Sequence, residues 1–85
     1  MEITQDIIKK LLINELFIET PEDKINIDDG LQSIIGLDSL GFIELRVLCE
    51  KKFGVKISDE NFTSEHFSTI RCLAQLIDSL KNNGH

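Results

Sequence analysis

The residues best suited to chemistry in this chain are Asp38 and Ser39, which follow Gly36 and precede an apolar, helix-compatible run. A glycine marks a loop, so Ser39 is predicted to lie on the last residue of that loop or the first residue of a helix. The first N–H groups of a helix lack an intrahelical partner, and the helix dipole presents its positive end there. A phosphate attached to the Ser39 hydroxyl would therefore lie in a favourable field.

The same pair of residues is also common at helix starts that have no chemical role. Asp and Ser are among the preferred N-cap residues, because their side-chain oxygens accept hydrogen bonds from the free N–H groups. From Asp38 and Ser39 alone, capping is the simpler interpretation. A longer pattern around them reverses that preference.

The pattern continues beyond Ser39 as Ile43-Glu44-Leu45, Phe53-Gly54-Val55 and Ile57. Together with Gly36-Leu37-Asp38-Ser39-Leu40, it resembles the central segment of the acyl carrier protein family, and the resemblance covers about residues 3–80. In that family the serine after the aspartate carries phosphopantetheine through a phosphodiester, which implies that Ser39 is the attachment site. The resemblance also implies that a phosphopantetheinyl transferase adds this arm from coenzyme A with a metal ion. The protein itself would then be no enzyme.

The predicted helix from Ser39 or Leu40 to Phe53 has two apolar stripes instead of one, at about 100° per residue. The stripe that we expect to pack inward contains Phe42, Leu45, Cys49 and Phe53. The other stripe, which begins beside Ser39, contains Leu40, Ile43 and Val47. We expect this second stripe to meet partners, because contiguous exposed apolar area marks interaction sites. The alternative is that the preceding loop covers both stripes.

The resemblance implies that enzymes approach along this helix with basic residues, so Asp38 and Glu44 are predicted to take part in recognition with the second stripe. The expected partners are the transferase and the acyl-loading, condensing and acyl-transfer enzymes of fatty-acid or polyketide type biosynthesis. The chain departs from the acidic pattern of fatty-acid carriers, because basic residues stand where those carriers often have acidic ones: Arg46, Lys51 and Lys52. The resemblance therefore leaves open which enzymes this protein accepts. If the helices part, a thioester-linked alkyl chain could enter the core at ~0.8 kcal/mol per buried CH₂.

Three other functions fit parts of the pattern. An aminoacyl or peptidyl carrier, loaded by an adenylating enzyme, is the alternative within the same superfamily. A non-carrier helical interaction adaptor, of the death-domain or sterile-alpha-motif kind, would use Ser39 only as a cap. A small hydrolase using Ser39, His66 and an aspartate is the least favoured, because 85 residues leave almost no scaffold for an oxyanion hole and a pocket.

Composition and charge limit the class of partner. The 85 residues suit one domain, and we expect a carrier domain over residues 1–80 with a disordered tail over 81–85. The net charge is −6, with −7 in residues 1–45 and +1 in residues 46–85. Such a surface repels nucleic acid and anionic membranes, and we expect a monomer. Without a signal-like N-terminus or an apolar run of ~18 residues, we expect a cytoplasmic protein.

Neither the cysteines nor the acidic residues predict a metal site. Cys49 and Cys72 lack the spacing of a zinc knuckle or redox pair, so we expect two buried thiols. Asp28-Asp29-Gly30 lacks the spaced ligands and distal glutamate of a calcium-binding EF-hand loop and is read as a solvated turn.

The remaining elements complete an all-α prediction: a small four-helix bundle, three longer helices and one short, with a long loop between the first and second helices. Three- and four-residue apolar spacing predicts helices over Glu2–Ile18 and Ile70–Leu80, the second capped by Thr69. Residues 24–36 should form a long loop pinned to the core, with a helical turn near 31–34. Gly54 should end the central helix, 55–57 should be an extended connector, and 58–67 should hold one or two short helical turns.

Overall fold

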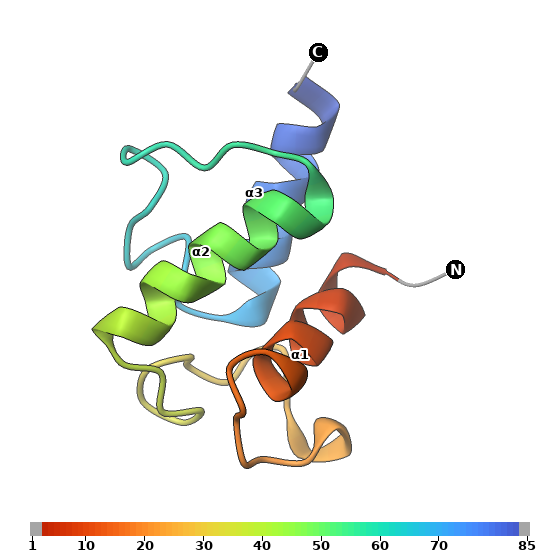
Figure 1. The fold of residues 1–85 in the computed structure, drawn as a ribbon, viewed down its shortest axis with the longest axis vertical. Coiled ribbons are helices and arrows are strands. Elements are labelled where there is room, and N and C mark those ends of the chain that lie inside the picture. Colours follow the sequence, from red (N-terminus) through yellow and green to blue (C-terminus); the bar gives the residue numbers. More distant parts are fainter. Residues whose placement is uncertain (1–2, 84–85) are drawn as a thin grey trace.

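The computed structural model describes residues 3–83, which form three α-helices and one 3₁₀ turn. These elements are α1 (Thr4–Asn14), η1 (Glu22–Lys24), α2 (Ser39–Phe53) and α3 (Ile70–Asn83). Within this part of the chain there is no strand, only an isolated bridge between Gly30 and Thr69. In Figure 1, α3 stands behind α2 and α1 lies below them, and α3 packs against both. The all-α prediction is confirmed.

The predicted fourth helix is present only as separate turns. Phe62 N–H donates to the carbonyl of Ser58 at 3.0 Å, and Phe67 N–H donates to the carbonyl of Thr63 at 3.0 Å, but the turns do not join into a helix. The polar side chains of this segment bond locally instead: the Thr63 hydroxyl accepts from the His66 N–H at 3.3 Å. Such bonds compete with helical ones. The one 3₁₀ turn in the described chain lies elsewhere, directly after Pro21.

Both terminal helices end at residues other than predicted. α1 ends at Asn14, not Ile18, and Phe17 has a φ of 55°, in the left-handed region. The chain reverses there so that Ile18 N–H bonds back to the Leu12 carbonyl at 3.0 Å. The predicted start at Glu2 lies outside the described residues.

The C-terminal helix is longer than its apolar stripe. α3 continues to Asn83, so residues 81–83, which were expected in a disordered tail, are helical. The rest of that tail, residues 84–85, lies outside the described residues. An apolar stripe fixes only where a helix is buried, and an exposed end can continue past it.

The core draws on all three helices and on both long connections. Among the side chains that the structure describes, nine are less than 2% exposed: Ile8, Leu12, Leu31, Leu45, Cys49, Ile57, Ile70, Leu73 and Ile77. Each such aliphatic side chain contributes about 1.5–3 kcal/mol by burial. Leu31 and Ile57 belong to the connections before and after α2, so both connections are pinned to the core as predicted for the first.

Hydrogen bonds fasten the long first connection to the start of α3. Leu31 N–H donates to the Ser68 carbonyl at 2.9 Å, and Arg71 N–H donates to the Ile27 carbonyl at 3.0 Å. The Arg71 guanidinium also holds the Asp28 carboxylate through Nε and Nη2 at 2.6 and 3.0 Å. These contacts set the position from which the chain enters α2.

α2 has the predicted bounds and α3 the predicted cap. Gly54 adopts a φ of 67° directly after α2, and its N–H bonds to the Glu50 carbonyl. A side chain would strain this left-handed turn, which explains the glycine. The Thr69 hydroxyl accepts from the Cys72 N–H at 3.1 Å, so Thr69 caps α3 as predicted. None of the helices over residues 3–83 is long and apolar enough to cross a membrane.

Candidate functional site

Asp38 and Ser39 occupy the N-terminus of α2 as predicted. Asp38 is the N-cap residue with an extended backbone, and its Oδ1 accepts from the Gly41 N–H at 2.7 Å. Ser39 is the first residue of the helix, and its side chain is exposed. The hydroxyl therefore lies at the positive end of the α2 dipole, within reach of another protein.

The turn before Ser39 is held from below by Leu37. Leu37 is 4% exposed, and its N–H donates to the Leu31 carbonyl at 2.8 Å. Gly36 precedes it with a φ of 90°, a conformation that favours glycine. A buried anchor two residues before Ser39 restricts the motion of the helix start and keeps the hydroxyl outside.

Gly41 allows Leu37 and Asp38 to pack closely against the first turn of α2, and it was not identified from the sequence. A Cβ at Gly41 would lie 3.0 Å from Leu37 Cγ and 3.2 Å from Asp38 Oδ1. A larger residue would therefore press on both the anchor and the cap. The available signal was a glycine inside an apolar helical run, which usually has a packing reason.

The two apolar stripes of α2 face as predicted. On the inner stripe Leu45 and Cys49 are buried, while Phe42 and Phe53 are partly buried against the core. On the outer stripe Leu40 is 71% exposed, Ile43 50% and Val47 41%. Glu44 is exposed beside them. The first connection does not cover the outer stripe, so an apolar surface extends from Ser39 along α2.

Arg46 is a structural residue rather than a free surface charge. Its Nε and Nη2 donate to the Ile57 carbonyl at 3.0 and 2.6 Å, and its Nη1 lies 2.9 Å from Asp59 Oδ1. The guanidinium also lies over the Phe62 ring, 4.9 Å from its centroid. From the same helix, Glu50 Oε2 accepts from the Ile57 N–H at 2.8 Å. These α2 side chains fasten the second connection.

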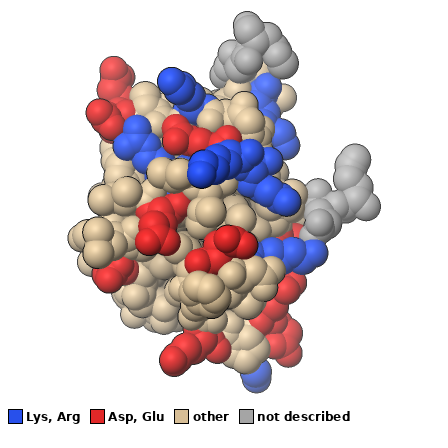
Figure 2. Space-filling model, viewed as in Figure 1, with Lys and Arg blue, Asp and Glu red and all other residues tan. Residues whose placement is uncertain are grey.

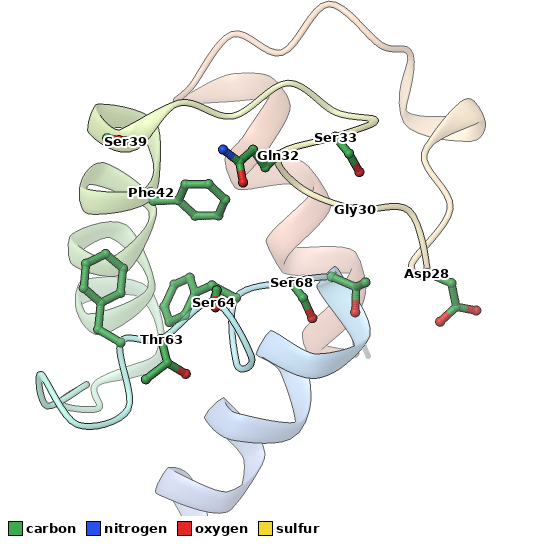
Figure 3. Close-up of a pocket in the computed structure, with 12 residues that line it drawn as sticks. Asp28, Gly30, Gln32, Ser33, Ser39, Phe42, Thr63, Ser64 and Ser68 are labelled. Atoms are coloured by element: carbon green, nitrogen blue, oxygen red, sulfur yellow. The ribbon is translucent and has the colours of Figure 1, made fainter.

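A cavity of about 580 Å³ opens beside Ser39. Its walls come from the N-terminal turns of α2, from the first connection and from the second connection, and Figure 3 shows how these segments enclose it. Three phenylalanines contribute to it, and two of them, Phe62 and Phe67, pack edge to face with centroids 5.0 Å apart. Most other lining residues carry hydroxyl or amide groups. The sequence did not predict this cavity.

The titratable groups near the site support no catalytic arrangement. Over residues 3–83, no cluster of His, Cys, Asp or Glu side chains could hold a metal ion. Within the same range, no hydrogen bond joins Ser39 to His66, so the hydrolase hypothesis gains no support from geometry. The hydrogen bond from Arg71 lowers the pKa of the Asp28 carboxyl, as expected for a structural ion pair.

The two cysteines differ in burial, although both were expected to be buried. Cys49 is fully buried, and desolvation raises the pKa of its thiol to about 12. Cys72 is only half-buried, and hydrogen bonds with Thr69 and Ser68 lower the pKa of its thiol. The prediction that Cys72 is buried is therefore wrong: Cys72 lies on the first turn of α3, where its thiol contacts Thr69 and Ser68 and stays partly exposed.

Comparison with known proteins connects this site to one family. Residues 6–77 match the family model described as phosphopantetheine attachment site. The chain is 36% identical to an acyl carrier protein of Treponema denticola over 62 residues, 73% of this chain and 77% of that protein. It is 33% identical to an acyl carrier protein of Zymomonas mobilis over 81 residues, 95% of this chain and 99% of that one. A D-alanyl carrier protein of Streptococcus sanguinis is 29% identical over 82 residues, 96% of this chain and 99% of that protein.

Proposed function

The chain belongs to the phosphopantetheine attachment family, whose members carry this group covalently on a serine, and we propose that the serine used here is Ser39. In this proposal the protein is a free-standing carrier that holds acyl intermediates and delivers them to fatty-acid or polyketide type enzymes. Phosphopantetheine, when bound, supplies a thiol that holds an acyl group as a thioester. The observation that carries the proposal is an exposed serine at a capped helix N-terminus.

The chain's own contribution is to present and orient the attachment point. The α2 dipole and the free N–H groups of its first turn favour a phosphodiester at Ser39. The Asp38 cap and the Leu37 anchor hold that turn in place. Ser39 is only an acceptor, so no base in this chain has to activate it; a phosphopantetheinyl transferase would supply that chemistry.

The outer stripe of α2 is the surface that we assign to partner recognition. Leu40, Ile43 and Val47 offer apolar area directly beside Ser39, and Asp38 and Glu44 offer negative charge to basic partner surfaces. Figure 2 shows blue side chains gathered in the upper part of this face, over the C-terminal end of α2, and red side chains mainly below them. A partner reaching Ser39 therefore meets the acidic end of the helix. We propose that the protein acts as a cytoplasmic monomer, away from nucleic acid and membranes.

One observation favours a second candidate for the cargo. The similarity to a D-alanyl carrier protein extends over nearly the whole chain, so an aminoacyl carrier of a nonribosomal-peptide or related type is the alternative. A panel of loading enzymes distinguishes the two: an adenylating enzyme would load an amino acid, whereas an acyltransferase would load an acyl group.

Intact-protein mass spectrometry tests the attachment. After incubation with coenzyme A, Mg²⁺ and a broad-specificity phosphopantetheinyl transferase, the protein should gain the mass of one arm, and Ser39→Ala should gain none. Ser33→Ala is the matched control, because Ser33 is an exposed serine that lines the same cavity, and it should be modified like the natural protein. No mass gain would favour the interaction-adaptor function instead, whereas modification of Ser39→Ala would show that a residue other than Ser39 carries the arm.

A further inference from the structure

The cavity beside Ser39 has the size and position of a ligand site. Its volume of about 580 Å³ lies within the range of about 300–1,000 Å³ typical of small-molecule pockets. Ser39 itself lines it, so an arm attached there could fold its end into the cavity without further movement of the protein. We call this cavity the hydroxyl groove.

Most of the residues that line the hydroxyl groove are polar, although three phenylalanines and the aliphatic parts of the side chains give it more apolar than polar surface. Of its twelve lining residues, six carry hydroxyls: Ser33, Ser39, Thr63, Ser64, Ser68 and Thr69. Gln32 adds an amide, which in Figure 3 lies between Phe42 and Ser33 and points into the enclosed space. An alkyl chain placed here would remove from water those polar groups that have no partner within the described chain, which costs free energy.

Some of the polar side chains that line the groove have no hydrogen-bond partner within the part of the chain that the structure describes. Thr63 and Thr69 accept from backbone N–H groups, and Ser68 donates to the Glu65 carbonyl. By contrast, within residues 3–83, the side chains of Gln32, Ser33 and Ser64 make no hydrogen bond. Those three side chains can therefore bond to a ligand without breaking a protein contact.

The apolar alternative to this groove is closed. In the core, Leu45 of α2 and Ile57 of the second connection are at most 1% exposed. The second connection, which would have to move to admit a chain, is held by Arg46 and Glu50 through the backbone of Ile57. Entry of a long alkyl chain would have to break these bonds, whereas entry into the hydroxyl groove breaks none.

We propose that the hydroxyl groove holds a short acyl group that carries a hydrogen-bonding substituent, and that Gln32 is its main specificity-determining contact. This inference rests on the proposed function, because it requires the arm on Ser39. The expected cargo is a short acyl group with a polar substituent, in preference to a long saturated acyl chain.

The rate of thioester hydrolysis tests the preference. The natural protein would be loaded by a phosphopantetheinyl transferase with 3-hydroxybutyryl-, butyryl- or octanoyl-coenzyme A, and each rate would be divided by that of the same acyl group on free pantetheine. The 3-hydroxybutyryl form should be protected roughly threefold more than the butyryl form, the effect of one net hydrogen bond. The octanoyl form should gain no more protection than the butyryl form.

Two variants assign the effect to the groove. Gln32→Ala should fold normally, since Gln32 is exposed, and should abolish the difference between the 3-hydroxybutyryl and butyryl forms. Gln75→Ala is the matched control, because Gln75 is exposed on α3 and does not line the groove, and it should keep the difference. In the natural protein, the side-chain amide resonances of Gln32 should also shift on loading with 3-hydroxybutyryl and not with butyryl.

The outcomes separate this inference from the proposed function. If the mass shows no arm on Ser39, both fail. If the arm attaches but the two short acyl groups are equally protected, only the cargo inference fails. It also fails if octanoyl is the best protected and shifts the resonances of Leu45 and Ile57, because the chain would then enter the core.

Discussion

Replacing Arg46 with alanine should destabilise the protein far more than its position on a helix surface suggests. The substitution removes two hydrogen bonds to the Ile57 carbonyl, an ion pair with Asp59 and the contact with the Phe62 ring. It also leaves the Ile57 carbonyl without its partner beside a side chain that is 1% exposed. Arg46 thus joins the middle of α2 to the second connection.

The expected loss of stability depends on how exposed each of these contacts is to solvent. A hydrogen bond from a charged donor contributes about 1.5–3 kcal/mol, and the Arg46 side chain is only 23% exposed, so much of that value should remain. The Asp59 side chain is 95% exposed, so its ion pair should add at most about 0.5 kcal/mol. The cation–π contact adds about 0.5–1 kcal/mol. We expect a loss of about 2–3 kcal/mol, which lowers Tm by roughly 10–20 °C in a domain of this size.

Urea unfolding followed by circular dichroism measures this loss directly. Arg46→Lys should recover only part of it, because lysine keeps the charge but cannot donate in a fork. Asp59→Ala, which removes the exposed ion pair alone, and Lys51→Ala, an exposed cation on the last turn of α2, should each change stability by less than about 0.5 kcal/mol. If Arg46→Ala is no more destabilising than Asp59→Ala, the hydrogen bonds from Arg46 to the Ile57 carbonyl do not stabilise the fold.

Three further predictions concern the cap, the thiols and acid stability. Asp38→Ala should lower the free energy of unfolding by about 1 kcal/mol in urea, whereas Asp38→Asn should keep most of it; equal losses would contradict the capping role. Thiol labelling at pH 8 should modify Cys72 first, with Cys49 roughly a thousandfold slower than an ordinary thiol, because its pKa is raised to about 12; rapid labelling of Cys49 in the folded protein would show that it is not buried. Because Arg71 holds the pKa of Asp28 below its ordinary value of 3.8, their contact stabilises the protein above that pH and is lost as the pH falls through the lower folded-state pKa. Asp28→Asn should therefore flatten the fall of the urea midpoint below pH 3.8; an unchanged slope would show that the pair does not contribute.

The start, end and orientation of α2 could be predicted from the sequence because each depends on neighbours along the chain. The cap at Asp38 bonds an N–H three residues later, and Gly54 closes the helix against the Glu50 carbonyl. The separation of the inner and outer stripes needs only the angular spacing of a helix. The family resemblance rests on the same local stretch, and the match over residues 6–77 confirms it.

Other features depend on contacts between distant segments, and the sequence alone left them undetermined. The partner of Arg46 is a backbone carbonyl eleven residues away. Every residue has such a carbonyl, so the sequence does not show which one Arg46 will contact. α1 ends early because Phe17 turns the chain so that Ile18 can bond back to Leu12. The turns over residues 58–67 follow the local bonds of their polar side chains rather than a helical pattern.

By itself, the sequence determined that the Ser39 hydroxyl lies at the start of a helix, because capping and helical periodicity act over a few residues. Only the tertiary structure decided what lies beside that hydroxyl. The groove joins residues near 30, 40 and 65, which are brought together by the buried Leu31 and Ile57 and by the bonds of Arg46 and Arg71. Its lining of hydroxyl, amide and phenyl groups therefore results from packing between distant segments, which local patterns do not encode.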